Sequence, residues 1–133
     1  MQKSTMVISV PLAEMDEVIR DVAAWPTFIP ELEAVRETGN GRCTFTIRQD
    51  GRRYEVDVAV RRSPHDHGML WTVVAGPAWN GHLYLQVAGA GRTRVHLELN
   101  VEARPVPDHL VELGLSRLQA AVARQRRVIR IPA

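Results

Sequence analysis

Hydrophobic and polar residues alternate along much of the chain from about residue 42 onward, and a period of two predicts β-strands. The pattern is clearest in the segment 42–49, where Cys43, Phe45 and Ile47 alternate with polar residues. Short turns separate the alternating segments, which is typical of an antiparallel sheet. The strands expected in this sheet are 42–49, 53–61, 69–75, 81–88 and 93–101.

The segments on either side of this region follow other patterns. Residues 5–10 alternate and predict a first strand. Apolar residues at helical spacing then predict a helix that begins at Pro11 and ends at Trp25-Pro26, since the residue before proline disfavours helical backbone. A short turn or helix is expected over 27–32. Asp108 is the predicted N-cap of a long last helix. The apolar stripe of that helix includes Leu115, Leu118 and Val122.

Several motifs along the chain resemble a known superfamily. Val10-Pro11 is followed by Asp21 and Trp25-Pro26, and the run Gly89 to Val95 reads GAGRTRV. These residues resemble the START-like superfamily, in particular its polyketide cyclase/dehydrase and lipid-transport group. The resemblance implies an α+β helix-grip fold, in which a curved antiparallel sheet wraps around a long C-terminal helix. It covers nearly the whole chain, so we expect one domain over residues 1–133.

The composition is that of an ordinary globular protein, with 45% hydrophobic and 24% charged residues and a formal net charge of +2. Arginines gather near the C-terminus, where cations suit the end of a helix, so we expect no nucleic-acid binding. The absence of a signal peptide and the single Cys43 favour a cytoplasmic location. No apolar run is long enough for membrane insertion. A polar outer sheet face favours a monomer or small homo-oligomer.

The strand alternation also predicts which side chains face the last helix. Apolar residues turn toward it, and the polar residues between them turn toward solvent. An apolar wall of this kind suits shape recognition of a hydrophobic small molecule. Trp71 and Trp79 are candidate stacking surfaces, with core filling as the alternative for Trp71. The predicted substrate-binding residues are Phe45, Val56, Val58, Trp71, Trp79, Leu83, Leu97 and Leu118.

Few residues in this pattern can transfer a proton. Tyr54 is the best inward-facing hydroxyl and a candidate catalytic residue, although a tyrosine of the core explains it equally well. His82 lies at the start of a strand near the presumed rim and is the second candidate catalytic residue. His65 and His67 are spaced to share a metal ion, but no third ligand is evident nearby. We therefore expect no metal site and no cofactor.

Three hypotheses about function follow. The resemblance implies an enzyme of the cyclase/dehydratase type, in which the pocket folds a polyketide-like substrate and Tyr54 and His82 assist with protons. The scarcity of inward polar groups instead favours a non-catalytic protein that binds or transports a hydrophobic metabolite such as a lipid, quinone or polyketide. The third possibility is a structural or regulatory domain whose own side chains fill the cavity.

Overall fold

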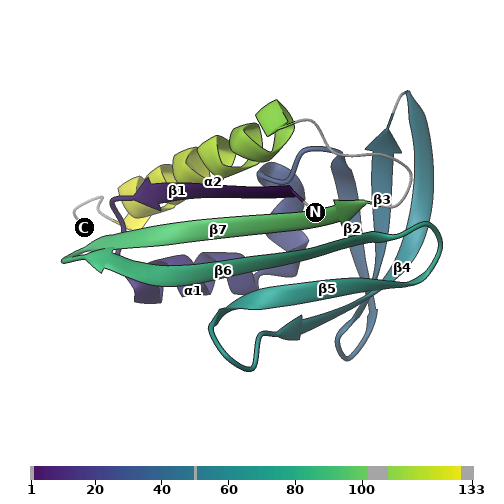
Figure 1. Ribbon diagram of the computed structural model, residues 1–133, viewed down its shortest axis with the longest axis horizontal. Helices are drawn as coiled ribbons and strands as arrows, with labels where there is room; N and C mark the ends of the chain where they lie inside the picture. Colours follow the sequence, from purple (N-terminus) through teal and green to yellow (C-terminus); the bar gives the residue numbers. More distant parts are fainter. Residues whose placement is uncertain (1, 50, 102–107, 130–133) are drawn as a thin grey trace.

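An antiparallel sheet makes up most of the computed structural model, which describes residues 2–49, 51–101 and 108–129. Within these residues the sheet has seven strands in the order β1-β7-β6-β5-β4-β3-β2. The sheet curves strongly, and the β2–β4 part turns away from the part formed by β1, β7 and β6 (Figure 1). The strands are β1 (Gln2–Ile8), β2 (Leu32–Gly39), β3 (Arg42–Gln49), β4 (Arg52–Arg62), β5 (His67–Ala75), β6 (Trp79–Gly89) and β7 (Arg92–Val101).

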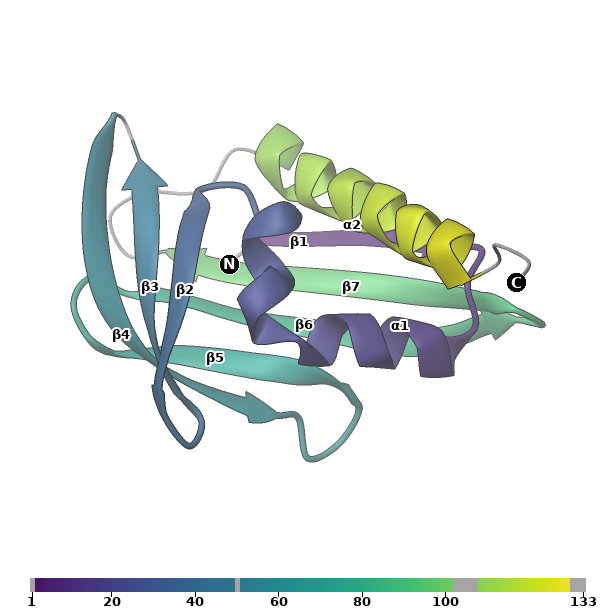
Figure 2. The same ribbon diagram turned by 180° about the vertical axis from the view of Figure 1, so that it is seen from behind.

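The helices cover the concave face of this sheet (Figure 2). The long helix α2 (Asp108–Ile129) packs against β1, β7 and the 3-10 helix η1 (Val22–Thr27). Helix α1 (Leu12–Arg20) packs against β5, β6 and β7, and η1 packs against β2. This arrangement confirms the predicted α+β helix-grip fold.

The predicted division of the sheet into an inner and an outer face is confirmed. Inward positions pair across neighbouring strands, for example Phe45 with Val56 and Leu83 with Leu97. All four of these side chains are at most 3% exposed. Gly51, in the turn between β3 and β4, and Gly91, in the turn between β6 and β7, both have a positive φ.

The structure differs from the sequence prediction mainly before residue 42. Strand β2 was not predicted. Leu32 is its one buried residue, and the residues after it do not alternate between buried and exposed. The short helix lies at Val22–Thr27 rather than 27–32 and contains Pro26. Glu31, with a φ of 75°, then turns the chain into β2. Strand β1 begins at Gln2, three residues earlier than predicted, because it pairs with β7 from Thr93 as far as Leu99.

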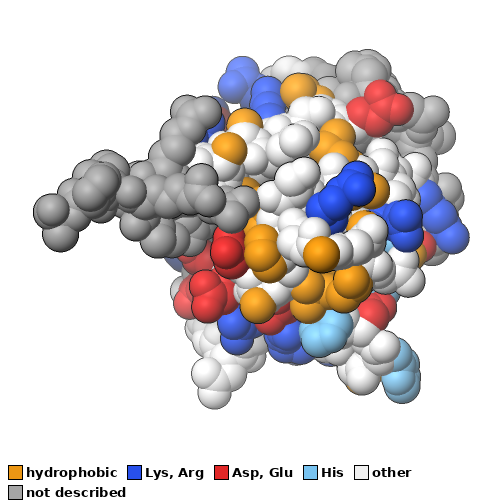
Figure 3. Space-filling model, turned by 90° about the vertical axis from the view of Figure 1, so that its left-hand side faces the viewer, with side chains coloured by type: hydrophobic (Ala, Val, Ile, Leu, Met, Phe, Trp, Pro, Cys, Tyr) orange, Lys and Arg blue, Asp and Glu red, His pale blue; other side chains and the backbone are white. Residues whose placement is uncertain are grey.

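Hydrophobic side chains also reach the surface at one end of the molecule. Figure 3 shows them among charged side chains on the end where β6 turns into β7. Val87, close to this turn, is 69% exposed. Scattered exposed hydrophobic residues are normal in soluble proteins and require no special explanation.

Candidate functional site

The predicted substrate-binding side chains all lie on the inner face of the sheet or on the buried stripe of α2. Each of them is at most 3% exposed. A water-sized sphere therefore touches almost none of their surface, and in this conformation they form a closed, packed interior. The set consists of Phe45, Val56, Val58, Trp71, Trp79, Leu83, Leu97 and Leu118.

Aromatic rings fill the centre of this interior. Trp25 of η1 meets Phe45 of β3 and Trp71 of β5 edge to face, with ring centroids 6.1 and 5.0 Å apart. Trp79 lies 6.1 Å from both Phe45 and Trp71. Gly81 occupies the position opposite Trp71 on β6, and a Cβ there would overlap the indole ring. Trp79, which lies between the predicted strands 69–75 and 81–88, is the first residue of β6 and part of the core.

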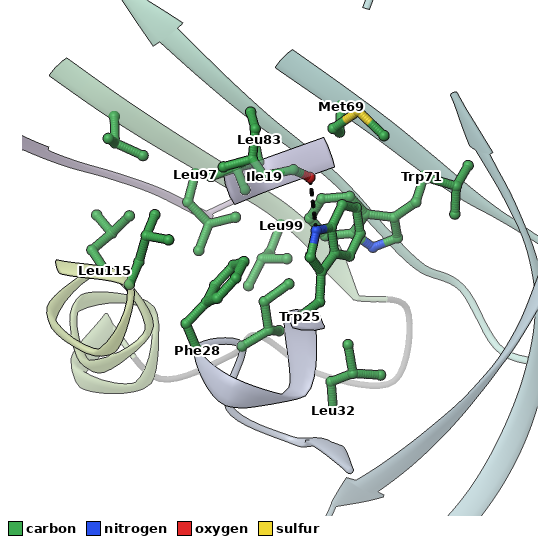
Figure 4. Close-up of a cluster of buried hydrophobic side chains, with 14 of the residues drawn as sticks. Ile19, Trp25, Phe28, Leu32, Met69, Trp71, Leu83, Leu97, Leu99 and Leu115 are labelled. Carbon is green, nitrogen blue, oxygen red and sulfur yellow. Dashed lines mark hydrogen bonds between the residues drawn. The ribbon is translucent and has the colours of Figure 1, made fainter. Parts of the chain in front are cut away.

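The indole N–H groups of these tryptophans differ in their hydrogen bonding. Trp25 Nε1 donates to the carbonyl oxygen of Ile19 at 2.9 Å, as Figure 4 shows. That oxygen lies in the last turn of α1, where carbonyls lack a partner within the helix. The Nε1 atoms of Trp71 and Trp79 are buried and have no hydrogen-bond partner among the residues that the structure describes. A buried donor without an acceptor costs about 1–3 kcal/mol, so most such groups in proteins are paired.

Tyr54 lies on the inner face of β4, as predicted, and is half-buried. Its hydroxyl donates to Gln49 Oε1 at 2.7 Å. Burial, with a smaller contribution from the charge of Glu31, raises the pKa of the Tyr54 hydroxyl. The hydroxyl is therefore a protonated donor at neutral pH, and in this conformation it is already used by Gln49.

His82 lies on the opposite, outer face of the sheet. Its Nε2 is 3.2 Å from Asp66 Oδ2, and its Nδ1 is 3.7 Å from Glu98 Oε2. Because the sheet separates His82 from Tyr54, the two predicted catalytic residues do not meet at one site. Sequence analysis missed the carboxylate partners of His82, although the short β6–β7 turn places His82 directly opposite Glu98.

Aromatic stacking extends this outer-face cluster along β6 and onto β7. The ring of Tyr84 lies 4.4 Å from that of His82 and stacks on His96 at 4.5 Å. Burial raises the pKa of Tyr84, as do the charge and hydrogen bond of Glu98 and the charge of Asp66. The Tyr84 hydroxyl therefore stays protonated and donates to Glu98 Oε1 at 3.4 Å.

His96 has a partner on each ring nitrogen. Its Nδ1 lies 3.0 Å from Thr5 Oγ1, and its Nε2 lies 2.7 Å from Gln86 Oε1. Burial and the charge of Arg94 lower the pKa of His96, against a smaller opposing contribution from Glu98. The ring is therefore more readily neutral than that of a histidine in water.

The remaining candidate groups are unsuited to metal binding or nucleophilic chemistry. The described part of the chain contains no group of three His, Cys, Asp or Glu side chains arranged to hold a metal ion. His65 and His67 are both exposed. Cys43 is buried, and burial, together with the charge of Glu37, raises the pKa of its thiol. A raised pKa keeps the thiol protonated, which suppresses its nucleophilicity.

The fold and its buried apolar interior agree with a family comparison. The sequence matches the family described as "Polyketide cyclase / dehydrase and lipid transport" over residues 2–129. The chain belongs to this family. A comparison with curated protein sequences finds no match.

Solved structures of other proteins have the same fold as this chain. A START superfamily protein from Mycobacterium smegmatis is 15% identical, with a TM-score of 0.71, covering 93% of this chain and 97% of the other. A protein from Deinococcus radiodurans is 18% identical, with a TM-score of 0.75 and coverages of 89% and 93%. The ZhuI aromatase/cyclase from Streptomyces sp. R1128 is 17% identical, with a TM-score of 0.67 and coverages of 97% and 94%.

At these identities the solved structures establish the polyketide cyclase/dehydrase fold and leave the activity of this member to be inferred from its own residues. Among the residues that the structure describes, no helix is both long and apolar enough to span a bilayer.

Proposed function

We propose that this chain binds a hydrophobic small molecule that carries acceptor oxygens, such as a polyketide or a quinone, between the sheet and its helices. The observation that carries the proposal is the pair of buried, unpartnered indole N–H groups of Trp71 and Trp79. In an apolar interior a ketone oxygen can accept such a hydrogen bond without bringing in a charge. A ligand with suitably placed oxygens would satisfy both donors.

The apolar surroundings of these donors support the same class of ligand. Phe45, Val56 and Leu83 offer shape and dispersion contacts and no charge. An ionic ligand would lose its hydration without finding a counter-ion among these side chains. The family description, which names both polyketide cyclases and lipid transport, agrees with an apolar or weakly polar ligand.

Binding requires a more open conformation than the one described. Trp71, Trp79 and Leu118 are each at most 1% exposed, so a ligand can reach the indole groups only after helices and sheet separate or side chains rearrange. Helix α2 approaches the chain segment after η1 closely at Gly114, where a Cβ would lie 3.0 Å from the carbonyl oxygen of Phe28. We therefore expect ligand binding to be slow relative to diffusion and limited by this opening.

The geometry favours binding over acid–base catalysis. Tyr54 and His82 lie on opposite faces of the sheet, so they cannot act together on one enclosed molecule. A cyclase activity is the second candidate function, favoured by the inward-facing hydroxyl of Tyr54, which would assist a ring closure brought about mainly by orientation. In that case Tyr54→Phe abolishes product formation and leaves affinity unchanged, whereas His82→Ala affects neither.

A matched pair of probes tests the proposed hydrogen bonds. 2-Acetonaphthone carries one ketone oxygen, and 2-isopropenylnaphthalene has nearly the same shape without it. We expect tighter binding of the ketone by about threefold to tenfold, the value of one net hydrogen bond. Replacing Trp71 and Trp79 together with β-(3-benzothienyl)alanine, which keeps the bicyclic shape but has no N–H, removes this preference.

Trp25 provides the control, because its N–H already donates to Ile19. The same replacement at Trp25 leaves the ketone preference unchanged. Equal affinity for the two probes in the wild-type chain contradicts the proposed donors. If neither probe binds, and no member of a panel of polyketides, quinones and lipids binds either, the binding function is contradicted. That result supports a domain whose core is filled by its own side chains.

A further inference from the structure

Strands β5 and β6 separate after Trp71 pairs with Gly81, and this separation opens a recess on the outer face of the sheet. Beyond that pair, the N–H of Val73 donates to the side-chain oxygen of Asn80 at 2.7 Å instead of to a main-chain carbonyl of β6. Strand β6 meanwhile stays paired with β7 as far as Trp79. The recess has a volume of about 260 Å³.

His82 and Glu98 are the titratable side chains in the lining of this recess. A carboxylate can only accept hydrogen bonds, so the contact of Asp66 with Nε2 places a proton on that nitrogen. In a neutral imidazole the other nitrogen, Nδ1, is then an acceptor. Nδ1 lies 3.7 Å from Glu98 Oε2, so in the neutral, Nε2-protonated form of His82 two acceptors face each other across this gap.

The other partners of Glu98 reach a different oxygen. The Tyr84 hydroxyl and the Lys3 ammonium contact Oε1, at 3.4 and 3.5 Å. Oε2 is left facing His82. A donor supplied from outside would satisfy both His82 Nδ1 and Glu98 Oε2, and a positive charge on that donor would complement the carboxylate.

We propose that this recess is a binding site for a small organic ammonium ion, whose N–H groups lie between His82 Nδ1 and Glu98 Oε2. The rest of the ligand lies in the recess, against Leu70 and the amides of Asn80 and Asn100. The volume suits a molecule of about ten heavy atoms, at the small end of the sites that bind small molecules. This site is on the opposite side of the sheet from the proposed hydrophobic ligand and is independent of it.

Other charged and aromatic groups surround His82 on the outer face. Asp66 and Glu98 face its ring nitrogens, Tyr84 stacks beside it, and Arg61 on β4 lies in the next outer-face position beyond Leu70.

A titration followed by NMR tests the site with benzylamine at pH 7.5, with benzyl alcohol and benzoate as neutral and anionic controls. We expect benzylammonium to shift the amide signals of β6 and β7 around His82, with a Kd of about 1 mM or below. Glu98→Gln, which removes the charge and keeps the shape, weakens binding by about tenfold or more. His96→Gln changes the affinity by less than about twofold, because His96 lies outside the recess and its ring nitrogens are paired.

Two results overturn the proposal: no localised shifts at about 10 mM benzylamine, or equal affinity of the wild-type and Glu98→Gln chains. The dispersion of the amide spectrum shows whether the variant is folded. If it is not, the ¹⁵N shifts of the His82 ring in the wild-type chain decide. A neutral ring protonated on Nε2 at pH 7.5 supports the site, and a ring protonated on Nδ1 excludes it.

Discussion

Removing the N–H of Trp79 while keeping its shape should stabilise the ligand-free chain. The perturbation is replacement of Trp79 with β-(3-benzothienyl)alanine, in which sulfur takes the place of the indole N–H. The Trp79 side chain is 1% exposed and its Nε1 has no partner within the described part of the chain, so the folded chain carries the full desolvation cost of that donor. Relief of this cost is about 1–3 kcal/mol, which for a chain of this size raises Tm by about 3–10 °C.

The same replacement at Trp25 should have the opposite sign. Its Nε1 donates to Ile19 at 2.9 Å, so the replacement removes a hydrogen bond and leaves a helix-terminal carbonyl without its partner. We expect a loss of about 1 kcal/mol or more. Urea unfolding followed by circular dichroism gives both values without relying on tryptophan fluorescence. If the Trp79 replacement destabilises the chain as much as the Trp25 replacement, the Trp79 N–H is paired and the reasoning is wrong.

Three further predictions rest on single residues. Gly81→Ala places a methyl group in the indole ring of Trp71 and should cost about 1–3 kcal/mol or more in urea unfolding, whereas Gly39→Ala, with open space around it, should be nearly neutral. Cys43 is buried and the pKa of its thiol is raised, so iodoacetamide should alkylate it at least about tenfold more slowly in the folded than in the unfolded chain. Equal alkylation rates would contradict its burial. The pKa of His96 is lowered on folding, so on acidification the His96 ring takes up a proton in the unfolded chain before it does so in the folded chain. Between about pH 7.5 and 5, the wild-type chain should therefore lose more free energy of unfolding than His96→Gln, and the same loss in both chains would contradict the shift.

Alternation along the strands was sufficient to predict the inner face of the sheet. Once Phe45 is placed inward, the period of two places Thr44 and Thr46 on the outer face. Thr44 is nevertheless buried there, and its hydroxyl donates to Asp57 Oδ1 at 3.2 Å. Strand β2 escaped prediction because edge strands need bury only one face, and this one buries little beyond Leu32. Its place in the sheet comes from pairing with β3 rather than from its own pattern.

The candidate sites were only partly predictable from the sequence. The alternation of inward and outward positions along the strands already placed Tyr54 inward and His82 outward. Their separation by the sheet therefore follows from the same pattern that predicted the strands. The contact between His82 and Asp66 depends on how the β4–β5 turn folds over the sheet, which no local pattern encodes. The unpartnered state of the Trp71 and Trp79 N–H groups depends on which acceptors surround them in three dimensions.

The most direct test of the proposed function is the ¹H–¹⁵N spectrum of the three indole N–H groups during a titration with 2-acetonaphthone. Hydrogen bonding to the ketone should move the Trp71 or Trp79 signal, or both, downfield, while the Trp25 signal, already bonded to Ile19, stays in place. 2-Isopropenylnaphthalene should not cause the downfield shift. If the ketone binds and the Trp71 and Trp79 signals do not move, these indole groups are not the donors of the binding site.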